Sequence, residues 1–537
     1  MKNKKLIFIV LISWCLTINM YAQNDINTVY NSTQIEKSKS YINGNEFQKD
    51  FLLFIDMIKN THPLFSDNIQ HPFNVDSISR LGYKKCSTFK NQDQFSNYVQ
   101  SVISKLHDGH SSVIRNSISN QIYPFSYYAD NRKYYLKITD KDHADFLGKE
   151  ITAINGIPLT KELDSFRNDF SYENEIRYQY LLGNNICFLS YWKGKPFFRP
   201  DSTLTITFAD NTNVSLRPTE RNKISLDDIR FHTQANGISI RKKSKDPFLY
   251  SIDDRNNICY LQFNECLDQI TLREKYANQG IKLTPIQEQM ISNIPRFDTF
   301  LKDMFSDIKT KNIKTLVIDV RDNGGGDSKL CDELLSWLKP INQIKSGSTF
   351  IRISAFAKQQ YPYLVSLQDQ FKKINLDIFS PSLLYQARTG KPLRLIGSDG
   401  VYLKKADSLT NTSENNIFRE NIIFIQNEQT FSSAGMLITG AVDNNIGLVI
   451  GTNNSFSPNS CGDILYWKLP NTNISGTITY KLFSRPDVNK INDNTIKLYQ
   501  YIRPSWKDFS TSNDNCWQWI LEKYGTVGDW HETKGVE

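Results

Sequence analysis

Cysteine, dense basic clusters and long apolar runs are all scarce in this sequence. Eight cysteines in 537 residues are too few for a fold built on disulfides. No CxxC pair and no cysteine–histidine cluster with zinc spacing occurs, so no metal site is predicted. The net charge is +8, yet no dense block of lysine and arginine accompanies it, and a nucleic-acid partner is not expected.

The overall composition is that of a globular protein. Hydrophobic residues make up 39% of the chain and charged residues 22%, which excludes a mainly disordered chain, a collagen and a multi-span membrane protein. Since a domain usually takes about 100–200 residues, the length predicts roughly two to four domains.

The N-terminus has the pattern of an export signal. Three lysines lie within the first five residues, Leu6 to Leu16 is almost wholly apolar, and the small residue Ala22 precedes Gln23. The apolar run is shorter than the roughly 20 residues needed to span a bilayer, although an uncleaved anchor is the alternative. Residues 1–22 are therefore predicted to be a signal peptide that directs the protein to the periplasm or outside the cell. No later segment predicts a membrane span.

Changes in hydrophobic pattern divide the rest of the chain. Residues 23–115 predict a helical region, 116–225 a small β-rich module, 248–510 an α/β layered domain, and 511–537 a tail. Apolar spacing predicts helices over residues 47–61, 92–106, 285–309 and 433–442. Alternating or fully apolar runs predict strands over residues 134–138, 150–154, 204–208, 257–263, 315–320, 421–426 and 448–451.

A glycine-rich segment follows one of the predicted buried strands. It reads Asp-Val-Arg-Asp-Asn-Gly-Gly-Gly-Asp over residues 319–327. Glycines let the backbone turn sharply and approach a ligand, and free N–H groups there can bind a negative oxygen. An ordinary glycine turn is the alternative. A phosphate loop is excluded because GxxxxGKS and GxxxxGKT are both absent.

Ser432 lies between a predicted strand and a predicted helix. A serine at such a corner presents its hydroxyl to solvent, while the next N–H and the helix N-terminus face the same point. A serine hydroxyl needs a nearby base to act as a nucleophile, and histidine serves best at neutral pH. His110, in the turn after the second predicted helix, is the best placed of seven histidines. Taken alone, Ser432 could be a helix N-cap and His110 a structural histidine.

The order of these segments resembles the S41 serine peptidases, the family of carboxy-terminal processing and tricorn-core proteases. The resemblance rests on the Asp-Gly-His turn, the Ile-Asn-Gly turn in the β-rich module, the DxRxNxGG segment and the serine before a helix, and it covers roughly residues 45–490. It implies an α+β multidomain fold with an N-terminal helical segment, a PDZ-like β module and a crotonase-like catalytic core.

The resemblance also implies a site and an activity. Ser432 would be the nucleophile and His110 the base, and the N–H groups of Ser433 and of Gly324 or Gly325 would form the oxyanion hole. No metal or organic cofactor is required. The protein would be a secreted or periplasmic endopeptidase, with peptides or unfolded proteins as its substrates. The PDZ-like module could bind a peptide strand by β-addition.

The chain departs from the family in two ways. No lysine follows Gly451 where one branch has its base, which disfavours a Ser–Lys pair. The orienting acid has no clear match, and Asp487 is the candidate nearest the expected position. Two alternative functions therefore remain: a non-catalytic protein that binds hydrophobic ligands or peptides, and an esterase that uses the same serine.

Overall fold

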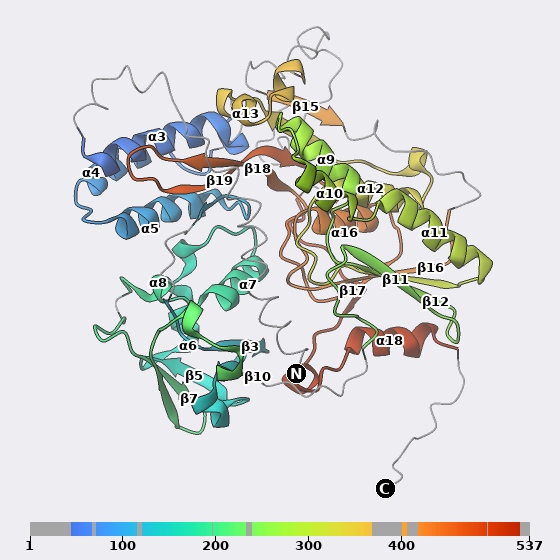
Figure 1. The fold of residues 1–537 in the computed structure, drawn as a ribbon, viewed down its shortest axis with the longest axis horizontal. Helices are drawn as coiled ribbons and strands as arrows, with labels where there is room; N and C mark the ends of the chain where they lie inside the picture. The colour runs from blue at the N-terminus through green and yellow to red at the C-terminus, as the bar shows by residue number, and fades with distance from the viewer. Residues whose placement is uncertain are drawn as a thin grey trace.

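The computed structural model describes residues 44–66, 71–114, 121–195, 197–231, 239–367, 400–404, 417–490 and 492–526 (Figure 1). The predicted signal peptide lies outside these residues. None of the described helices combines the length and the apolar character that crossing a bilayer requires. The described cysteines form no disulfide with one another: they are Cys86, Cys187, Cys259, Cys266, Cys331, Cys461 and Cys516.

The described chain opens with three helices: α3 (Glu46–Thr61), α4 (Val75–Cys86) and α5 (Gln92–Ile103). The predicted helices over 47–61 and 92–106 are confirmed, the second with its last turn as a 3₁₀ helix over residues 104–106. Helix α3 begins with a capping box between Asn45 and Gln48 and ends before Pro63, because a residue preceding proline disfavours the helical conformation. Helix α4 was not predicted.

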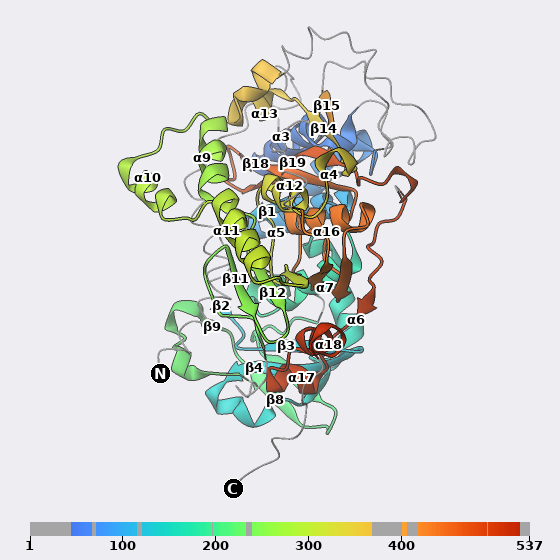
Figure 2. The same cartoon turned by 90° about the vertical axis from the view of Figure 1, so that its right-hand side faces the viewer.

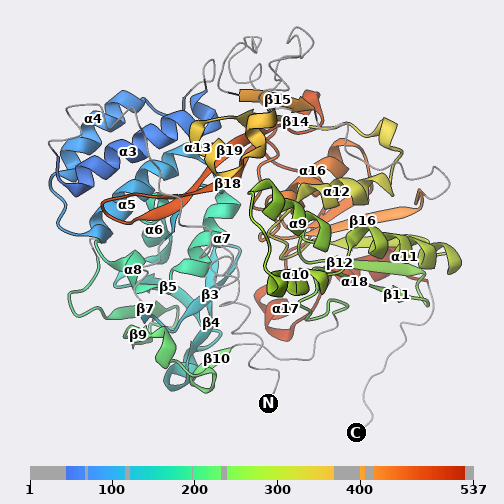
Figure 3. The same ribbon diagram turned by 45° about the horizontal axis from the view of Figure 1, so that its top comes forward.

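These helices pack on a five-stranded sheet whose strands come from distant parts of the chain. The order is β1-β19-β14-β15, with β18 also paired to β19. The strands are β1 (Ser112–Ile114), β14 (Ser348–Arg352), β15 (Gly400–Lys404), β18 (Ser460–Lys468) and β19 (Ser475–Phe483). The long β18–β19 hairpin extends from beside α3 and α5 to the middle of the molecule (Figures 1 and 3). This hairpin therefore ties the N-terminal helices to the C-terminal half of the chain.

A second sheet forms the β-rich module, residues 121–231. Its order is β10-β4-β5-β7-β8, with β3 on β4 and β6 on β5. The strands are β3 (Ser126–Asp130), β4 (Lys133–Asp140), β5 (Glu150–Ile154), β6 (Ile157–Pro158), β7 (Leu204–Phe208), β8 (Asn213–Leu216) and β10 (Ile229–Phe231). A separate pair joins β2 (Gln121–Ile122) to β9 (Thr219–Glu220). The predicted strands are confirmed.

The module also contains helices that the sequence reading did not predict. They are α6 (Leu159–Asp164), α7 (Glu175–Asn185) and α8 (Leu189–Trp192). Buried aromatic side chains such as Phe166 and Trp192 fill the space between helices and sheet. Helix α7 lies on the side of the module that faces the rest of the molecule (Figure 1).

A third sheet has six strands in the order β11-β12-β13-β16-β17-β20, all parallel except for β11. The strands are β11 (Phe248–Asp253), β12 (Ile258–Phe263), β13 (Thr315–Asp319), β16 (Asn421–Gln426), β17 (Leu448–Gly451) and β20 (Gln500–Tyr501). The central strands are buried on both faces, as expected for parallel strands between helices. This part matches the predicted α/β layering.

Helices cover both faces of this sheet (Figure 2). One face carries a core that includes residues of α11 (Phe297–Thr310), α12 (Ser328–Ser336) and α16 (Ser433–Asp443). The other face packs against α18 (Asn515–Tyr524), which brings Trp517 and Ile520 into the core. The other α-helices in the described residues are α9 (Gln269–Asn278), α10 (Pro285–Ser292), α13 (Ala355–Gln360) and α17 (Trp506–Thr511).

The helix predicted over residues 285–309 is two helices. Helix α10 ends at Ser292 and α11 begins at Phe297. Pro295 lies between them, and a proline inside a helix removes a hydrogen bond and clashes with the preceding turn. Helix α11 turns its apolar residues toward the core, whereas α10 buries only Ile291 and leaves Ile286 and Met290 exposed.

Candidate active site

The glycine turn begins where β13 ends, and its first polar residues anchor it to the fold. The buried Asp319 carboxylate contacts Arg321 at 2.7 Å and Arg241 at 3.2 Å and accepts the hydroxyl of Tyr260 at 2.5 Å. Arg321 also pairs with Asp514, next to α18, at 2.9 Å. Burial alone would raise the pKa of Asp319, but the two arginines hold it near 2. The Asp and Arg of the motif are therefore structural.

The serine turn, residues 427–433, lies beside the glycine turn because β13 and β16 are neighbouring parallel strands. The N–H of Phe431 donates to the carbonyl of Asn323 at 3.0 Å, and the hydroxyl of Thr430 donates to the carbonyl of Val320 at 2.8 Å. The Ser433 hydroxyl donates to the carbonyl of Gly326 at 2.7 Å. These bonds fix one turn against the other.

Ser432 has an unusual backbone conformation. Its φ is 52° and its ψ is −127°, a region that residues with a side chain rarely adopt. It immediately precedes α16, yet its side chain makes no capping hydrogen bond to that helix. The side chain of Ser432 therefore does not cap α16, and its hydroxyl is available for another contact.

The predicted oxyanion donors differ in their hydrogen bonding. The N–H of Gly325 donates to the side-chain oxygen of Asn323 at 2.8 Å. Within the described part of the chain, the N–H groups of Gly324 and Ser433 donate to no acceptor. Gly325 has a φ of +105°, and a Cβ there would lie 2.7 Å from the Cβ of Ser432 and 2.8 Å from the nitrogen of Ser433. Glycine at 325 is required by this close approach.

His110 reaches Ser432 from the N-terminal region. Its Nε2 lies 3.0 Å from the hydroxyl oxygen of Ser432, although the residues are 322 positions apart. The imidazole stacks on the ring of Phe431, with centroids 4.6 Å apart. The guanidinium carbon of Arg177 also lies over the Phe431 ring, 3.7 Å from its centroid. The structure thus brings together the two side chains proposed from the sequence.

Asp108 holds the turn that carries His110. Its Oδ1 accepts the backbone N–H of His110 at 2.9 Å, and its Oδ2 accepts the hydroxyls of Ser111 at 2.5 Å and Thr479 at 2.8 Å. The carbonyl of His110 accepts the hydroxyl of Thr477 at 2.7 Å. Both threonines belong to β19, so the hairpin fixes the histidine turn in place.

His62 is a site-adjacent residue that the sequence reading set aside. It is fully buried, and its Nδ1 accepts the N–H of Leu64 at 3.3 Å. The proton therefore sits on Nε2, which donates to Oδ2 of Asp108 at 3.2 Å. Burial alone would raise the pKa of Asp108, but the hydrogen bond from His62, with smaller effects from His110 and Ser111, lowers it below its ordinary value.

The predicted partner of His110, Asp487, lies elsewhere. Its carboxylate contacts Lys490 at 3.5 Å and Lys345 at 3.8 Å, and its N–H donates to Asp443 at 3.0 Å. Asp443, at the end of α16, also pairs with Arg485 at 2.6 Å. The segment after β19 is thus held by an ion-pair cluster at the far end of α16, one helix length from Ser432. Among the described residues, none of the contacts of Asp487 is to His110.

Two other carboxylates face Nδ1 of His110. Oε1 of Glu173 lies 3.6 Å away and Oδ1 of Asp108 lies 3.8 Å away. Glu173 immediately precedes Asn174, the N-cap of α7 in the β-rich module, and the sequence reading missed it. No motif marks it, because nothing local links position 173 to position 110. The donor atoms of Asp108, His110 and Glu173 lie within 4.8 Å of one another, close enough to hold a metal ion.

Comparison with known proteins now adds to this geometry. Residues 281–497 match peptidase family S41. The resemblance drawn from the sequence is therefore confirmed, and the matched segment contains both the glycine turn and Ser432, whereas His110 and Glu173 precede it. The family match supports a protease, a hydrolase that acts on peptides or proteins.

Solved structures extend the likeness beyond the S41 segment. Mature CPAF complexed with lactacystin aligns with a TM-score of 0.56 and 14% identity, over 87% of this chain and 95% of that one. A crystal structure of mature CPAF gives a TM-score of 0.56 and 15% identity, over 87% and 94%. At these identities the likeness shows a shared mixed α+β, multidomain fold. No curated protein matches the sequence.

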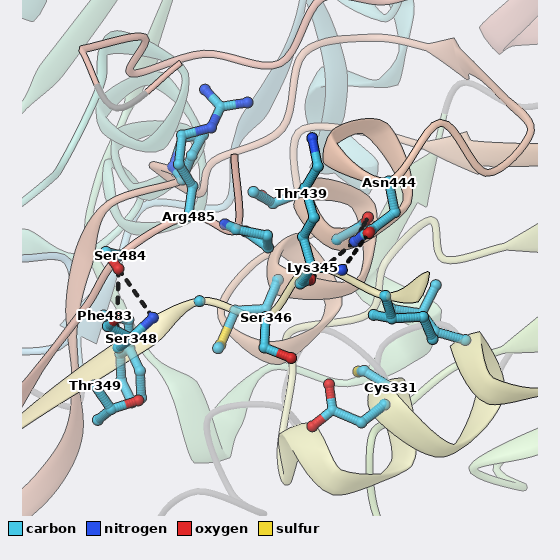
Figure 4. A pocket seen from close by; sticks show the side chains of 18 residues that line it. Cys331, Lys345, Ser346, Ser348, Thr349, Thr439, Asn444, Phe483, Ser484 and Arg485 are labelled. Carbon is cyan, nitrogen blue, oxygen red and sulfur yellow. Dashed lines mark hydrogen bonds between the residues drawn. The ribbon is translucent and has the colours of Figure 1, made fainter. Parts of the chain in front are cut away.

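A pocket lies within the S41 segment, between α12, α16, β14 and the end of β19 (Figure 4). Thr439 and Asn444 of α16 and Lys345 line it, as does Met436, one turn after Ser432. Neither Ser432 nor His110 lines it. The pocket is therefore adjacent to the Ser432–His110 pair but separate from it. Arg485, which also lines the pocket, donates two hydrogen bonds to the carboxylate of Asp443.

Proposed function

We propose that this protein is an exported serine endopeptidase in which Ser432 is the nucleophile and His110 the general base. The observation that carries the proposal is the 3.0 Å contact between Nε2 of His110 and the hydroxyl of a serine held in a rare backbone conformation at a helix N-terminus. A nucleophile and base within hydrogen-bond reach are the minimum that acyl transfer requires.

The acylation step follows from this geometry. The oxygen of Ser432 bonds to the carbonyl carbon of the substrate while its proton passes to Nε2 of His110. The carbonyl oxygen becomes an oxyanion, for which the N–H groups of Gly324 and Ser433 are the available donors. The C–N bond then breaks as His110 returns the proton to the leaving amine, which leaves an acyl group on Ser432.

Deacylation repeats the sequence with water. His110 takes a proton from the water, whose oxygen attacks the acyl carbon, and the proton returns to the oxygen of Ser432 as the carboxylic acid leaves. In this scheme Gly325 is not a donor, since its N–H is engaged by Asn323. Its role is to leave room beside the nucleophile. Removal of one oxyanion donor typically costs about 10²–10³ in rate.

We also infer that the sheet of residues 121–231 is the PDZ-like module and that the six-stranded sheet with its helices is the crotonase-like core. The antiparallel sheet with a packed helix and the parallel sheet covered on both faces support this assignment. The PDZ-like module would bind a peptide strand at a sheet edge. Export rests on the signal-like residues 1–22.

Labelling with a fluorophosphonate probe tests the Ser–His pair on purified residues 23–537. Wild type should label, Ser432→Ala should not label, and His110→Ala should label only at a low residual rate, with circular dichroism showing that both variants fold. Wild type that fails to label would overturn the activated serine. If wild type labels, cleavage of unfolded proteins is assayed next. Cleavage of small esters without cleavage of any protein would favour an esterase.

A further inference from the structure

Two buried atoms without hydrogen-bond partners face each other behind the catalytic histidine. They are Nδ1 of His110 and Oε1 of Glu173, both with no partner among the described residues. Their separation is 3.6 Å, slightly longer than a hydrogen bond. The Glu173 side chain is only 3% exposed, so water does not readily take the place of the missing partner. A shift of about 0.7 Å would join the pair at ordinary hydrogen-bond distance.

Asp108, the other carboxylate near Nδ1, is already committed. Its Oδ1 accepts the backbone N–H of His110, and its Oδ2 serves His62, Ser111 and Thr479. The 3.8 Å distance from Oδ1 to Nδ1 is a consequence of holding the backbone of the same residue. Asp108 therefore determines where the histidine turn lies and leaves Nδ1 to another acceptor.

Glu173 is held so that one oxygen remains free for Nδ1. Its Oε2 accepts the N–H of Ser457 at 2.9 Å, which fixes the carboxylate between the β-rich module and the loop after β17. Gly109 lies against the same carboxylate, and a Cβ there would be 3.4 Å from Oε1. Burial raises the pKa of Glu173 above its ordinary value, against the opposing effects of His110 and the Ser457 N–H.

We propose that Glu173 is the positioning residue for His110: its Oε1 accepts the Nδ1 proton, which keeps Nε2 unprotonated toward Ser432 and stabilises the imidazolium formed during acylation. This inference rests on the proposed function. It assigns the role to a residue of the β-rich module rather than to the segment after β19. The module then completes the catalytic centre, and its docking is required for reactivity.

The test is the second-order rate of fluorophosphonate labelling between pH 5 and 9. Glu173→Gln should lower the rate by about 10²–10⁴-fold and shift the acid limb of the profile to lower pH, because the imidazolium loses its counter-charge. Glu173→Asp should restore part of the rate. The control is Glu175→Gln, two residues away, where an exposed carboxylate pairs with Arg167, and it should label as wild type.

Other charges near His110 stay constant in this comparison. They are Asp108 below the ring, Asp463 on β18, and Arg177 on Phe431. Adding Glu173→Gln to His110→Ala should change the residual rate no further, because Glu173 acts through the histidine. A purely structural role would lower the rate in both backgrounds. If Glu173→Gln does not fold, Glu173→Asp and the double variant with Asp carry the test.

Three outcomes overturn the inference. If wild type labels and Glu173→Gln labels within threefold at every pH, Glu173 does not position His110, and the proposed function survives. If wild type labels only when a divalent metal is added and a chelator abolishes labelling, the three clustered donors hold a metal and do not form a relay. If wild type never labels, the proposed function fails, and this inference fails with it.

Discussion

The serine half and the histidine half of the candidate site differ in how much of the chain each needs. The serine half consists of two turns after neighbouring strands, β13 and β16, which are joined by hydrogen bonds between residues 320–326 and 430–433. The histidine half needs the turn after α5, β19, His62 and Glu173 of the β-rich module. A local motif specifies the first, and only tertiary packing assembles the second.

The largest expected effect tests the serine half. Gly325→Ala should reduce fluorophosphonate labelling by at least about 10²-fold, because the new Cβ would displace Ser432 or the N–H of Ser433. The control is Gly194→Ala, where φ is +84° and nothing lies within 4 Å of a Cβ. The control should lose about 1–2 kcal/mol from backbone strain alone and keep its labelling rate. Equal labelling by both variants would contradict the close-approach argument.

The second effect tests the histidine half. Asp108→Asn should lower the free energy of unfolding by about 3 kcal/mol at pH 7. The amide lacks the negative charge of a buried carboxylate that accepts hydrogen bonds from four groups, including His62. The folded-state pKa of Asp108 is depressed, so this stability is present above the unfolded pKa and is lost as pH falls below about 4. Denaturant unfolding at pH 7 and pH 3 should therefore show a difference that shrinks in acid.

The same carboxylate-to-amide change at Asp487 is the matched control. Its contacts are Lys345 and Lys490, far along α16 from Ser432. Asp487→Asn should label within about threefold of wild type, a change below roughly 0.7 kcal/mol in barrier. A large loss of labelling in this variant would restore the interpretation that the sequence suggested and the geometry rejected.

The third effect concerns the contact between the two halves. Phe431 belongs to the serine turn and stacks on His110, and the guanidinium carbon of Arg177 of α7 lies 3.7 Å from its ring centroid. Arg177→Met should lower labelling by about 5–30-fold, since a desolvated cation–π contact is worth roughly 1–2 kcal/mol. The control is Arg167→Met, which removes a cation from Tyr178 at 4.5 Å, away from Phe431. It should leave labelling unchanged.

The smallest expected effect is a pH-dependent change in stability, and it comes from helix α12, which follows the glycine turn of the serine half. Burial, with the nearby carboxylates Asp298 and Asp268, raises the pKa of Glu333 on α12 to about 7. The folded state thus binds a proton that the unfolded state has already lost, so stability declines as pH rises from about 4 to 7. Glu333→Gln should raise Tm by about 1–3 °C at pH 8 and leave it unchanged below pH 4. Glu522→Gln, an exposed change, should do neither.

Sequence patterns predicted elements well where the signal was local. The strands at 421–426 and 448–451 and the helix ending at Thr61 were placed to the residue, because their apolar runs end at polar or proline positions. Helices α4 and α7 were missed. Helix α7 is only weakly amphipathic, and it is specified by packing in the aromatic core of the module.

Among the site residues, Ser432 and His110 could be proposed because each lies in a recognisable turn. Asp487 was chosen by its position relative to the family pattern, and position along a chain does not fix position in space. Its neighbours Arg485 and Lys490 instead bind Asp443 and direct that segment to the end of α16. Glu173 had no local signal, since its partners, Ser457 and His110, are distant in sequence.

The sequence by itself determined the layered core, the glycine turn and the serine at the strand–helix corner, because hydrophobic period and glycine content act over a few residues. The tertiary structure decided which carboxylate faces His110 and that the β-rich module supplies it. The reason is that a contact between a buried histidine and a carboxylate depends on differences of a fraction of an ångström in the separation of groups that only packing brings together.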